Sequence, residues 1–245
     1  MGTLMLLRHG ETTFNAAQVF TGFLDADLAP SGEAQVGVAA RLIAAEGLVP
    51  GVLWQSTMRR AVRTTELLLG HLGHRDVPVH ASWRLVERGY GCLTGLAKAE
   101  ARRRYGDELF FQWRRTVHGR PPAADPAVVA TWTDPAPVSE RGPLDAGAGE
   151  SLADVAARVM PFWRRTIEPL LADDQTVFVV SHGNTLRALA SVVFDLSDER
   201  VERLNIPAGH PLVMTFDDGT LGQPRYLDAD TARAAAAAVA AEGGT

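Results

Sequence analysis

Two short apolar runs in this chain each end in a histidine followed by glycine, and this arrangement constrains the fold more than any other feature. Leu4–Leu7 leads into Arg8-His9-Gly10, and Val177–Val180 leads into Ser181-His182-Gly183. A short apolar run bounded by polar residues is typical of a buried strand. In open α/β sheets, ligands bind beyond the carboxyl ends of the strands. We therefore predict that both imidazoles belong to one site.

The rest of the chain alternates apolar runs with amphipathic segments. This pattern predicts an α/β fold with a mainly parallel sheet flanked by helices. Ser31 is expected to cap a helix that ends near Gly47. Ser151 and Asp154 resemble a capping box for a helix to about Leu171, with kinks expected at prolines 161 and 169. Further strands are expected at 52–54, 77–79 and 213–216, and further helices at 61–69, ending near Gly70, and at 185–194.

We interpret residues 1–245 as a single domain. Residues from about 88 to 149 combine basic helical segments with a stretch rich in Pro, Ala and Asp. This segment is expected to be a helical and loop insertion over the active site. The tail from about 230 to 245 is rich in alanine, and it is expected to be a loose helix or a mobile segment.

Composition excludes several classes of protein. The chain has 24 Lys+Arg against 29 Asp+Glu, a net charge of -5, so a nucleic-acid partner is not expected. One Cys excludes a disulfide framework within the chain. No apolar run is long enough for a transmembrane helix, so we expect no membrane partner and a cytoplasmic protein. No metal-binding spacing is present, and no metal is expected.

Arginines and one carboxylate add to the two histidines as candidates for chemistry. Arg8 precedes His9, and Arg60 begins the segment after the second expected strand. Guanidinium groups are well suited to phosphate oxygens because they are planar, forked and permanently charged. Glu87 lies between two arginines, and a carboxyl group beside a phosphate is suited to general acid–base catalysis. The alternatives are histidines that only hydrogen-bond in loops and a glutamate in a surface ion pair.

The segment Arg8-His9-Gly10-Glu11-Thr12 resembles the R-H-G-E/Q-T/S signature of the histidine phosphatase superfamily. Segments along nearly the whole chain resemble the 2,3-bisphosphoglycerate-dependent phosphoglycerate mutases within it. They include Gln112-Trp113-Arg114-Arg115, His182-Gly183-Asn184 and Leu204-Asn205-Ile206-Pro207.

The resemblance implies a phosphohistidine mechanism. His9 would be the nucleophile, Arg8, Arg60 and His182 would hold the transferring phosphate, and Glu87 would exchange protons with the substrate hydroxyls. 2,3-Bisphosphoglycerate would prime the enzyme, which would interconvert 3-phosphoglycerate and 2-phosphoglycerate in glycolysis and gluconeogenesis as a homodimer or homotetramer. The residues that would bind phosphates and carboxylate, besides Arg8, Arg60 and Glu87, are Asn15, Thr21, Gly22, Arg88, Tyr90, Lys98, Arg114, Arg115, Gly183 and Asn184.

Several positions depart from the mutase pattern. The usual N-E-R-H-Y-G appears as Val86-Glu87-Arg88-Gly89-Tyr90-Gly91, and the usual P-T-G-[IV]-P appears as Pro207-Ala208-Gly209-His210-Pro211. Gly89 removes an imidazole beside the expected proton-transfer carboxylate. These changes leave open two alternatives: a phosphatase or mutase for another small phosphorylated acid or phosphoester, and a non-enzymatic module that binds phosphorylated acids.

Overall fold

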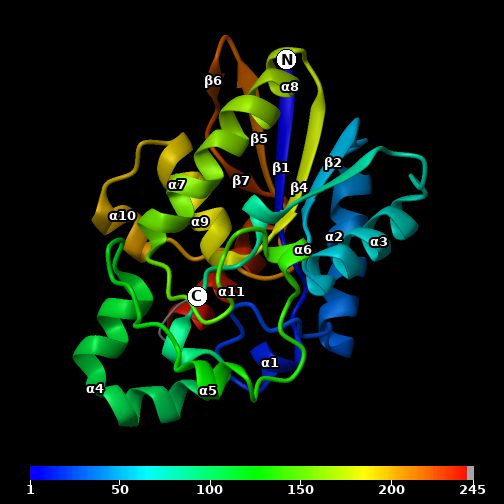
Figure 1. Ribbon diagram of the computed structural model, residues 1–245. Coiled ribbons are helices and arrows are strands. Elements are labelled where there is room, and N and C mark those ends of the chain that lie inside the picture. The colour runs from blue at the N-terminus through cyan, green and yellow to red at the C-terminus, as the bar shows by residue number, and fades with distance from the viewer. Residues whose placement is uncertain (242–245) are drawn as a thin grey trace.

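A computed structural model describes residues 1–241 and contains one mixed sheet. The strand order is β3-β2-β4-β1-β5-β6, and β7 pairs with β5 (Figure 1). Strands β1, β4, β2 and β3 run parallel, whereas β5 is antiparallel to β1. The strands are β1 (Gly2–Arg8), β2 (Val52–Ser56), β3 (Val79–Ser82), β4 (Thr176–Ser181), β5 (Leu212–Asp217), β6 (Thr220–Leu221) and β7 (Arg225–Tyr226). The predicted α/β fold with a mainly parallel sheet is confirmed.

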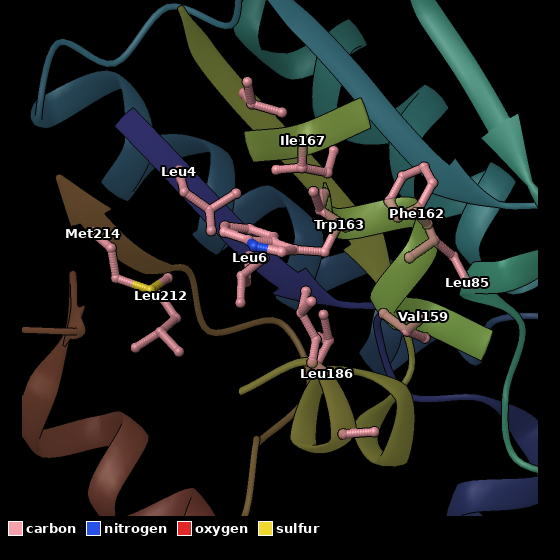
Figure 2. Packing of buried hydrophobic residues seen from close by; sticks show 14 of the residues in the cluster. Leu4, Leu6, Leu85, Val159, Phe162, Trp163, Ile167, Leu186, Leu212 and Met214 are labelled. Carbon is pink, nitrogen blue, oxygen red and sulfur yellow. The ribbon is translucent and has the colours of Figure 1, made fainter. Parts of the chain in front are cut away.

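Helices cover both faces of the sheet because β1 and β4 are apolar on both faces. Met5, Leu7 and Phe178 point to the layer formed by α2 (Pro30–Ala45) and α3 (Arg59–Leu72). Leu4 and Leu6 instead pack with Trp163 and Ile167 in the layer on the other face (Figure 2). Alternate side chains of a strand point to opposite faces, so a strand buried on both sides is a continuous apolar run.

The second layer is built from α7 (Leu152–Phe162), α8 (Glu168–Ala172) and α9 (Gly183–Val193). Ser151 and Asp154 form the predicted capping box at the start of α7. A π-helical turn, Trp163–Ile167, joins α7 to α8 between the two prolines where kinks are predicted. Pro169 has no N–H to donate to the preceding turn, which accounts for the irregular hydrogen bonding there.

The insertion lies beyond the carboxyl ends of the parallel strands (Figure 1). Its longest helix, α4 (Lys98–Arg115), bends at Gly106, whose φ of 82° is a left-handed conformation that glycine adopts readily. The remaining short elements are α1 (Thr13–Ala16), η1 (Trp83–Leu85), η2 (Gly91–Leu93), α5 (Pro126–Val129), α6 (Val138–Arg141) and α10 (Asp198–Arg203).

Two helix ends differ from the sequence prediction. Ser31 does not cap α2, because Pro30 begins the helix after Ala29, and the Ser31 hydroxyl donates to the Glu11 carboxylate. Helix α3 continues past Gly70 and ends at Gly73, whose φ of 75° forms the left-handed cap.

The alanine-rich tail forms α11 (Ala229–Ala241), and residues 242–245 of the predicted tail lie outside the described residues. Within residues 1–241, no helix is both long and apolar enough to cross a membrane.

Candidate active site

The two histidines lie side by side because the strands that carry them are neighbours. Arg8 of β1 is paired with Ser181 of β4, and the His9 N–H donates to the Ser181 carbonyl over 3.0 Å. The His9 and His182 ring centroids are therefore 5.0 Å apart, with planes inclined by 63°. The two imidazoles that we predict to share one site are therefore neighbours in the structure.

His9 is arranged as a nucleophile. Its Nδ1 lies 2.7 Å from the carbonyl oxygen of Gly10. A carbonyl can only accept, so Nδ1 carries the proton and Nε2 keeps its lone pair. Burial, with the charges of Arg60 and Arg8, holds the pKa of His9 well below its usual value of 6.5. The imidazole is therefore neutral near pH 7, as nucleophilic attack requires.

His182 is held in the opposite tautomer. The Nε–H of Arg60 donates to His182 Nδ1 over 3.2 Å, so that nitrogen is unprotonated. His182 Nε2 then donates to the Ser56 hydroxyl over 2.8 Å. Burial and the nearby charge of Arg60 lower the pKa of His182 well below 6.5. Ser56, at the end of β2, was not identified from the sequence, since a serine at the end of a strand is common and indicates no particular chemistry.

Arg60 connects His182 to the loop that follows α1. It is 1% exposed, and its two Nη atoms donate to the carbonyls of Leu24 and Gly22 over 2.9 and 3.1 Å. Burial lowers the pKa of Arg60 to about 10, so the group remains charged near neutral pH. The φ of Gly22 is +52°, and this turn presents its carbonyl to Arg60. Gly22 therefore acts through its backbone.

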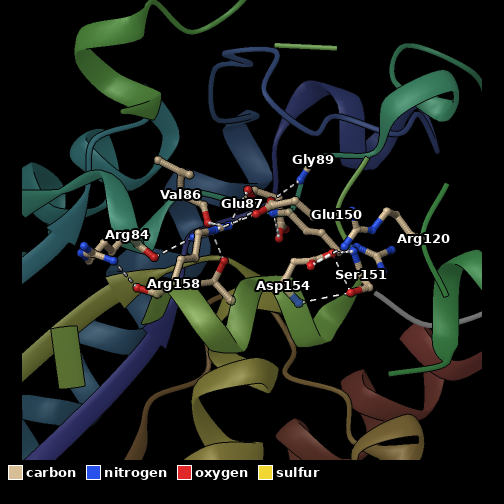
Figure 3. Close-up of polar contacts among 11 residues, drawn as sticks. Arg84, Val86, Glu87, Gly89, Arg120, Glu150, Ser151, Asp154 and Arg158 are labelled. Carbon is tan, nitrogen blue, oxygen red and sulfur yellow. Dashed lines mark hydrogen bonds and ion pairs between the residues drawn. The ribbon is translucent and has the colours of Figure 1, made fainter. Parts of the chain in front are cut away.

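The Glu87 segment is fixed by a buried ion pair that sequence reasoning missed. Arg158 of α7 donates to the carbonyls of Val86 and Glu87 over 2.9 and 3.0 Å (Figure 3). Arg158 Nε also lies 2.9 Å from the Glu150 carboxylate, and the other Glu150 oxygen accepts from the Gly89 N–H over 2.8 Å. These bonds hold the Glu87 backbone in place. No signal in the sequence marks Arg158, because the carbonyls that it holds lie more than 70 residues away.

A cavity of about 270 Å³ opens beside His9. Nine other residues predicted for the site line it: Arg8, Asn15, Thr21, Arg60, Glu87, Tyr90, Lys98, Arg114 and Asn184. Lys98 and Arg114 come from the two ends of α4, so the insertion supplies two cations to the lining. Four of these residues are cations, which makes the cavity suitable for a small polyanion although the protein is acidic overall.

The other five predicted residues lie behind this lining: His182, Gly22, Arg88, Arg115 and Gly183. Arg88 is fully buried, with its guanidinium 4.7 Å from the centre of the Tyr90 ring. Arg115 donates to Asn205 and to the Glu202 carbonyl. Gly183 begins α9 directly after His182. In the described structure these residues therefore support the lining.

Sequence reasoning also missed part of the lining. The helix α11 contributes Ala235, Ala238 and Val239, and the segment after α10 contributes His210. Alanines carry no chemical signal, whereas His210 stood out only as a departure from the mutase pattern. The described residues contain no group of three or more His, Cys, Asp or Glu side chains that could hold a metal ion.

The fold and the paired histidines define a class of phosphoryl-transfer protein. The family model described as "Histidine phosphatase superfamily (branch 1)" matches residues 4–227. A solved mycobacterial glucosyl-3-phosphoglycerate phosphatase complexed with VO3 is similar, with a TM-score of 0.69 and 25% identity. The match covers 92% of this chain and 97% of that chain.

Curated relatives narrow the class. A 2,3-bisphosphoglycerate-dependent phosphoglycerate mutase of Nitratidesulfovibrio vulgaris is 45% identical, covering 99% of this chain and 98% of its own. The mutase of the same name from Cutibacterium acnes is 43% identical, covering 98% of each. This chain therefore belongs to the histidine phosphatase superfamily and, within it, to the family of 2,3-bisphosphoglycerate-dependent phosphoglycerate mutases.

Proposed function

We propose that the protein interconverts 3-phosphoglycerate and 2-phosphoglycerate through a phosphohistidine on His9. One observation carries this proposal: a neutral imidazole, with its Nε2 lone pair available, lies in a cavity lined by Arg8, Arg60, Lys98 and Arg114. A nucleophile needs the lone pair, and transfer of a phosphoryl group is stabilised mainly by positioned positive charge.

The roles of the residues follow from the chemistry of each transfer. His9, when phosphorylated on Nε2, gives its phosphoryl group to the free hydroxyl of the bound acid. The P–N bond breaks, a P–O bond forms, and Glu87 takes the hydroxyl proton. The phosphoryl group on the other carbon then returns to Nε2, and Glu87 gives the proton to the departing oxygen. Arg8 and Arg60 stabilise the charge on the transferring group, and the family resemblance assigns His182 to the same task.

The cavity fits the priming cofactor that the family implies. 2,3-Bisphosphoglycerate carries two phosphates and a carboxylate, and four cations line the cavity. We propose that Arg8 and Arg60 hold one phosphate, while Lys98 and Arg114 hold the far end. When bound, the cofactor would supply the first phosphoryl group to His9.

The test is an isomerisation assay with and without added 2,3-bisphosphoglycerate. We expect turnover of 3-phosphoglycerate to be strongly stimulated by the cofactor and abolished in His9→Ala. His118→Ala is the matched control, because His118 is 77% exposed and lies outside the cavity. Absence of stimulated turnover in a folded, cofactor-treated enzyme would reject the mutase assignment.

A second candidate is a phosphatase acting on a related phosphoester. It is supported by the similarity to the mycobacterial phosphatase and by Gly89, where the mutase pattern has histidine. The test is phosphate release across a panel of phosphoesters. Inertness toward all compounds except the phosphoglycerates would reject this candidate. That result would mean that the closed site keeps water away from the phosphohistidine during transfer.

We further propose that the chain forms a homodimer or homotetramer. Strand β3 is the edge of the sheet next to β2, and Val79 on it is 41% exposed. Edge strands and exposed apolar side chains favour association. Light scattering coupled to gel filtration tests the oligomeric state. We expect the reaction to serve glycolysis and gluconeogenesis in the cytoplasm.

A further inference from the structure

A histidine–carboxylate pair lies at the wall of the cavity. His210 lines the cavity, and its Nδ1 is 2.7 Å from Oδ2 of Asp228. The two side chains are only 14% and 13% exposed. A carboxylate oxygen accepts, so His210 Nδ1 donates, and Nε2 is the ring nitrogen left for a second contact.

The position of His210 is fixed by the backbone around it. The N–H of Gly209 donates to the Arg8 carbonyl over 3.1 Å, directly before the nucleophile. Gly209 has a φ of 73°, and a Cβ at this position would lie 2.7 Å from Cβ of Gln35. Only glycine fits this close approach without strain. His210 is therefore held on the side of the cavity formed by Arg8 and α2.

Asp228 directly precedes α11, which also lines the cavity. Its carbonyl accepts from the Ala232 N–H over 2.9 Å, in the first turn of α11. Its Oδ1 is buried and has no hydrogen-bond partner among the described residues. Because Oδ1 is shielded from water and has no hydrogen-bond partner in the described part of the chain, the imidazole is the polar side chain that the Asp228 carboxylate contacts through Oδ2.

The surface pair of His118 and Asp198 shows what an incidental histidine–carboxylate contact looks like here. Its atoms are 3.5 Å apart, and the side chains are 77% and 56% exposed. Neither residue lines the cavity. The His210 pair is shorter and more buried, and His210 lines the cavity where an anionic ligand would bind.

We propose that His210, with both ring nitrogens protonated, donates from Nε2–H to an anionic oxygen of the substrate, and that Asp228, which accepts from Nδ1–H, is its positioning residue. The proposal rests on the proposed function, which brings a phosphorylated acid into this cavity. In that doubly protonated form, the ring makes two charge-assisted hydrogen bonds, one to the carboxylate and one to the substrate oxygen. The isoleucine or valine of the usual P-T-G-[IV]-P pattern offers no such donor, so His210 is a specificity determinant of this chain.

The experiment compares His210→Val, His210→Gln and Asp228→Asn with wild type and with His118→Val as the matched surface control. Calorimetric titration of the unphosphorylated enzyme with 3-phosphoglycerate measures binding without turnover, and steady-state kinetics give KM and kcat. Thermal unfolding shows whether each variant is folded.

A charge-assisted hydrogen bond at a partly exposed site is expected to change affinity by about fivefold to tenfold. His210→Val should therefore raise both Kd and KM by about that factor, with a much smaller change in kcat. His210→Gln should recover most of the affinity, because its amide Nε2 reaches about as far as the imidazole Nε2. Asp228→Asn should raise Kd by about threefold, since the imidazole loses its charged partner. His118→Val should leave all three values unchanged.

Two results would overturn the inference. One is a Kd for folded His210→Val within twofold of wild type, and the other is a loss in His210→Gln equal to that in His210→Val. Failure of the proposed function looks different: wild type would then bind 3-phosphoglycerate without isomerising it, or not bind it. In the latter case inorganic phosphate is the probe, and unchanged phosphate affinity in His210→Val overturns the inference.

Discussion

Gly89 offers the sharpest test of how the acid–base segment is packed. A Cβ at this position would lie 2.6 Å from the carbonyl oxygen of Ala148 and 3.0 Å from Cε2 of Phe23. The Ala148 oxygen already accepts from the Gly91 N–H over 3.1 Å, and the Gly89 carbonyl accepts from the Glu150 N–H over 2.8 Å. The obstacles are the Ala148 backbone and the buried ring of Phe23, so Gly89→Ala must displace the segment that carries Glu87.

The expected cost combines three contributions. Overpacking a buried site costs about 1–3 kcal/mol, and weakening a buried backbone hydrogen bond costs about 1 kcal/mol. The smaller conformational freedom of alanine in the unfolded chain returns about 0.5–1 kcal/mol. The net destabilisation for Gly89→Ala is about 2 kcal/mol. In a chain of this size, that lowers the melting temperature by about 4–8 °C.

The assay is thermal unfolding together with kcat/KM for 3-phosphoglycerate. We expect the rate constant to fall at least about tenfold, because displacement of a catalytic group by about 1 Å can cost a hundredfold. Gly70→Ala is the matched control: Gly70 lies inside α3, and the nearest atom to its Cβ is a flexible Arg75 nitrogen at 3.6 Å. That variant should gain about 0.5–1 kcal/mol.

If Gly89→Ala melts at or above the wild-type temperature while Gly70→Ala is stabilised as expected, the packing argument is wrong. The same geometry bears on restoring the imidazole of the mutase pattern. Gly89→His carries the same Cβ and a larger side chain, so we expect it to unfold at a still lower temperature. The histidine of that pattern therefore requires a different backbone path from the one that Ala148 takes here.

Three further predictions follow from the buried polar groups and the cavity wall. Because burial lowers the pKa values of His9 and His182 below 6.5, the unfolded chain binds more protons than the folded protein below that pH. In urea titrations, the free energy of unfolding should be highest above about pH 6.5 and fall by about 2 kcal/mol per pH unit below it. An unfolding free energy that stays constant down to about pH 5 would contradict this. Arg158→Met leaves its partner carboxylate buried and alone, so it should destabilise by about 3–5 kcal/mol in the same assay, and a loss under 1 kcal/mol would refute the structural role. Ala235→Trp should raise KM about tenfold or more by filling the cavity that α11 lines, whereas Ala237→Trp, on an exposed position outside the lining, should not; equal KM values would show that α11 does not limit access.

The sequence predicted those parts of the structure that depend on local pattern. The runs ending at Arg8 and Ser181 identify β1 and β4, and parallel strand ends bring their histidines together. The prediction that Ser31 caps α2 is wrong because of a tertiary contact: the Ser31 hydroxyl donates to the distant Glu11 carboxylate, and the helix begins at Pro30 instead.

The supporting residues of the site could not be predicted for a related physical reason. Arg158 acts on the carbonyls of Val86 and Glu87, and carbonyls are present at every residue, so they leave no mark in the sequence. Likewise, Ala235 contributes only its shape and position to the cavity. Pattern reasoning identifies groups with distinctive chemistry, but groups that act through backbone or through volume require the fold.

The central position of β1 has a consequence for how the chain is made. This strand leaves the ribosome well before its two neighbours, β4 and β5, which are Thr176–Ser181 and Leu212–Asp217. At ordinary synthesis rates, roughly 10–30 s pass before β4 is available to pair with it. Throughout this time an apolar strand has neither edge covered. We expect nascent chains that stop before residue 176 to depend on chaperones and to lack the paired histidines.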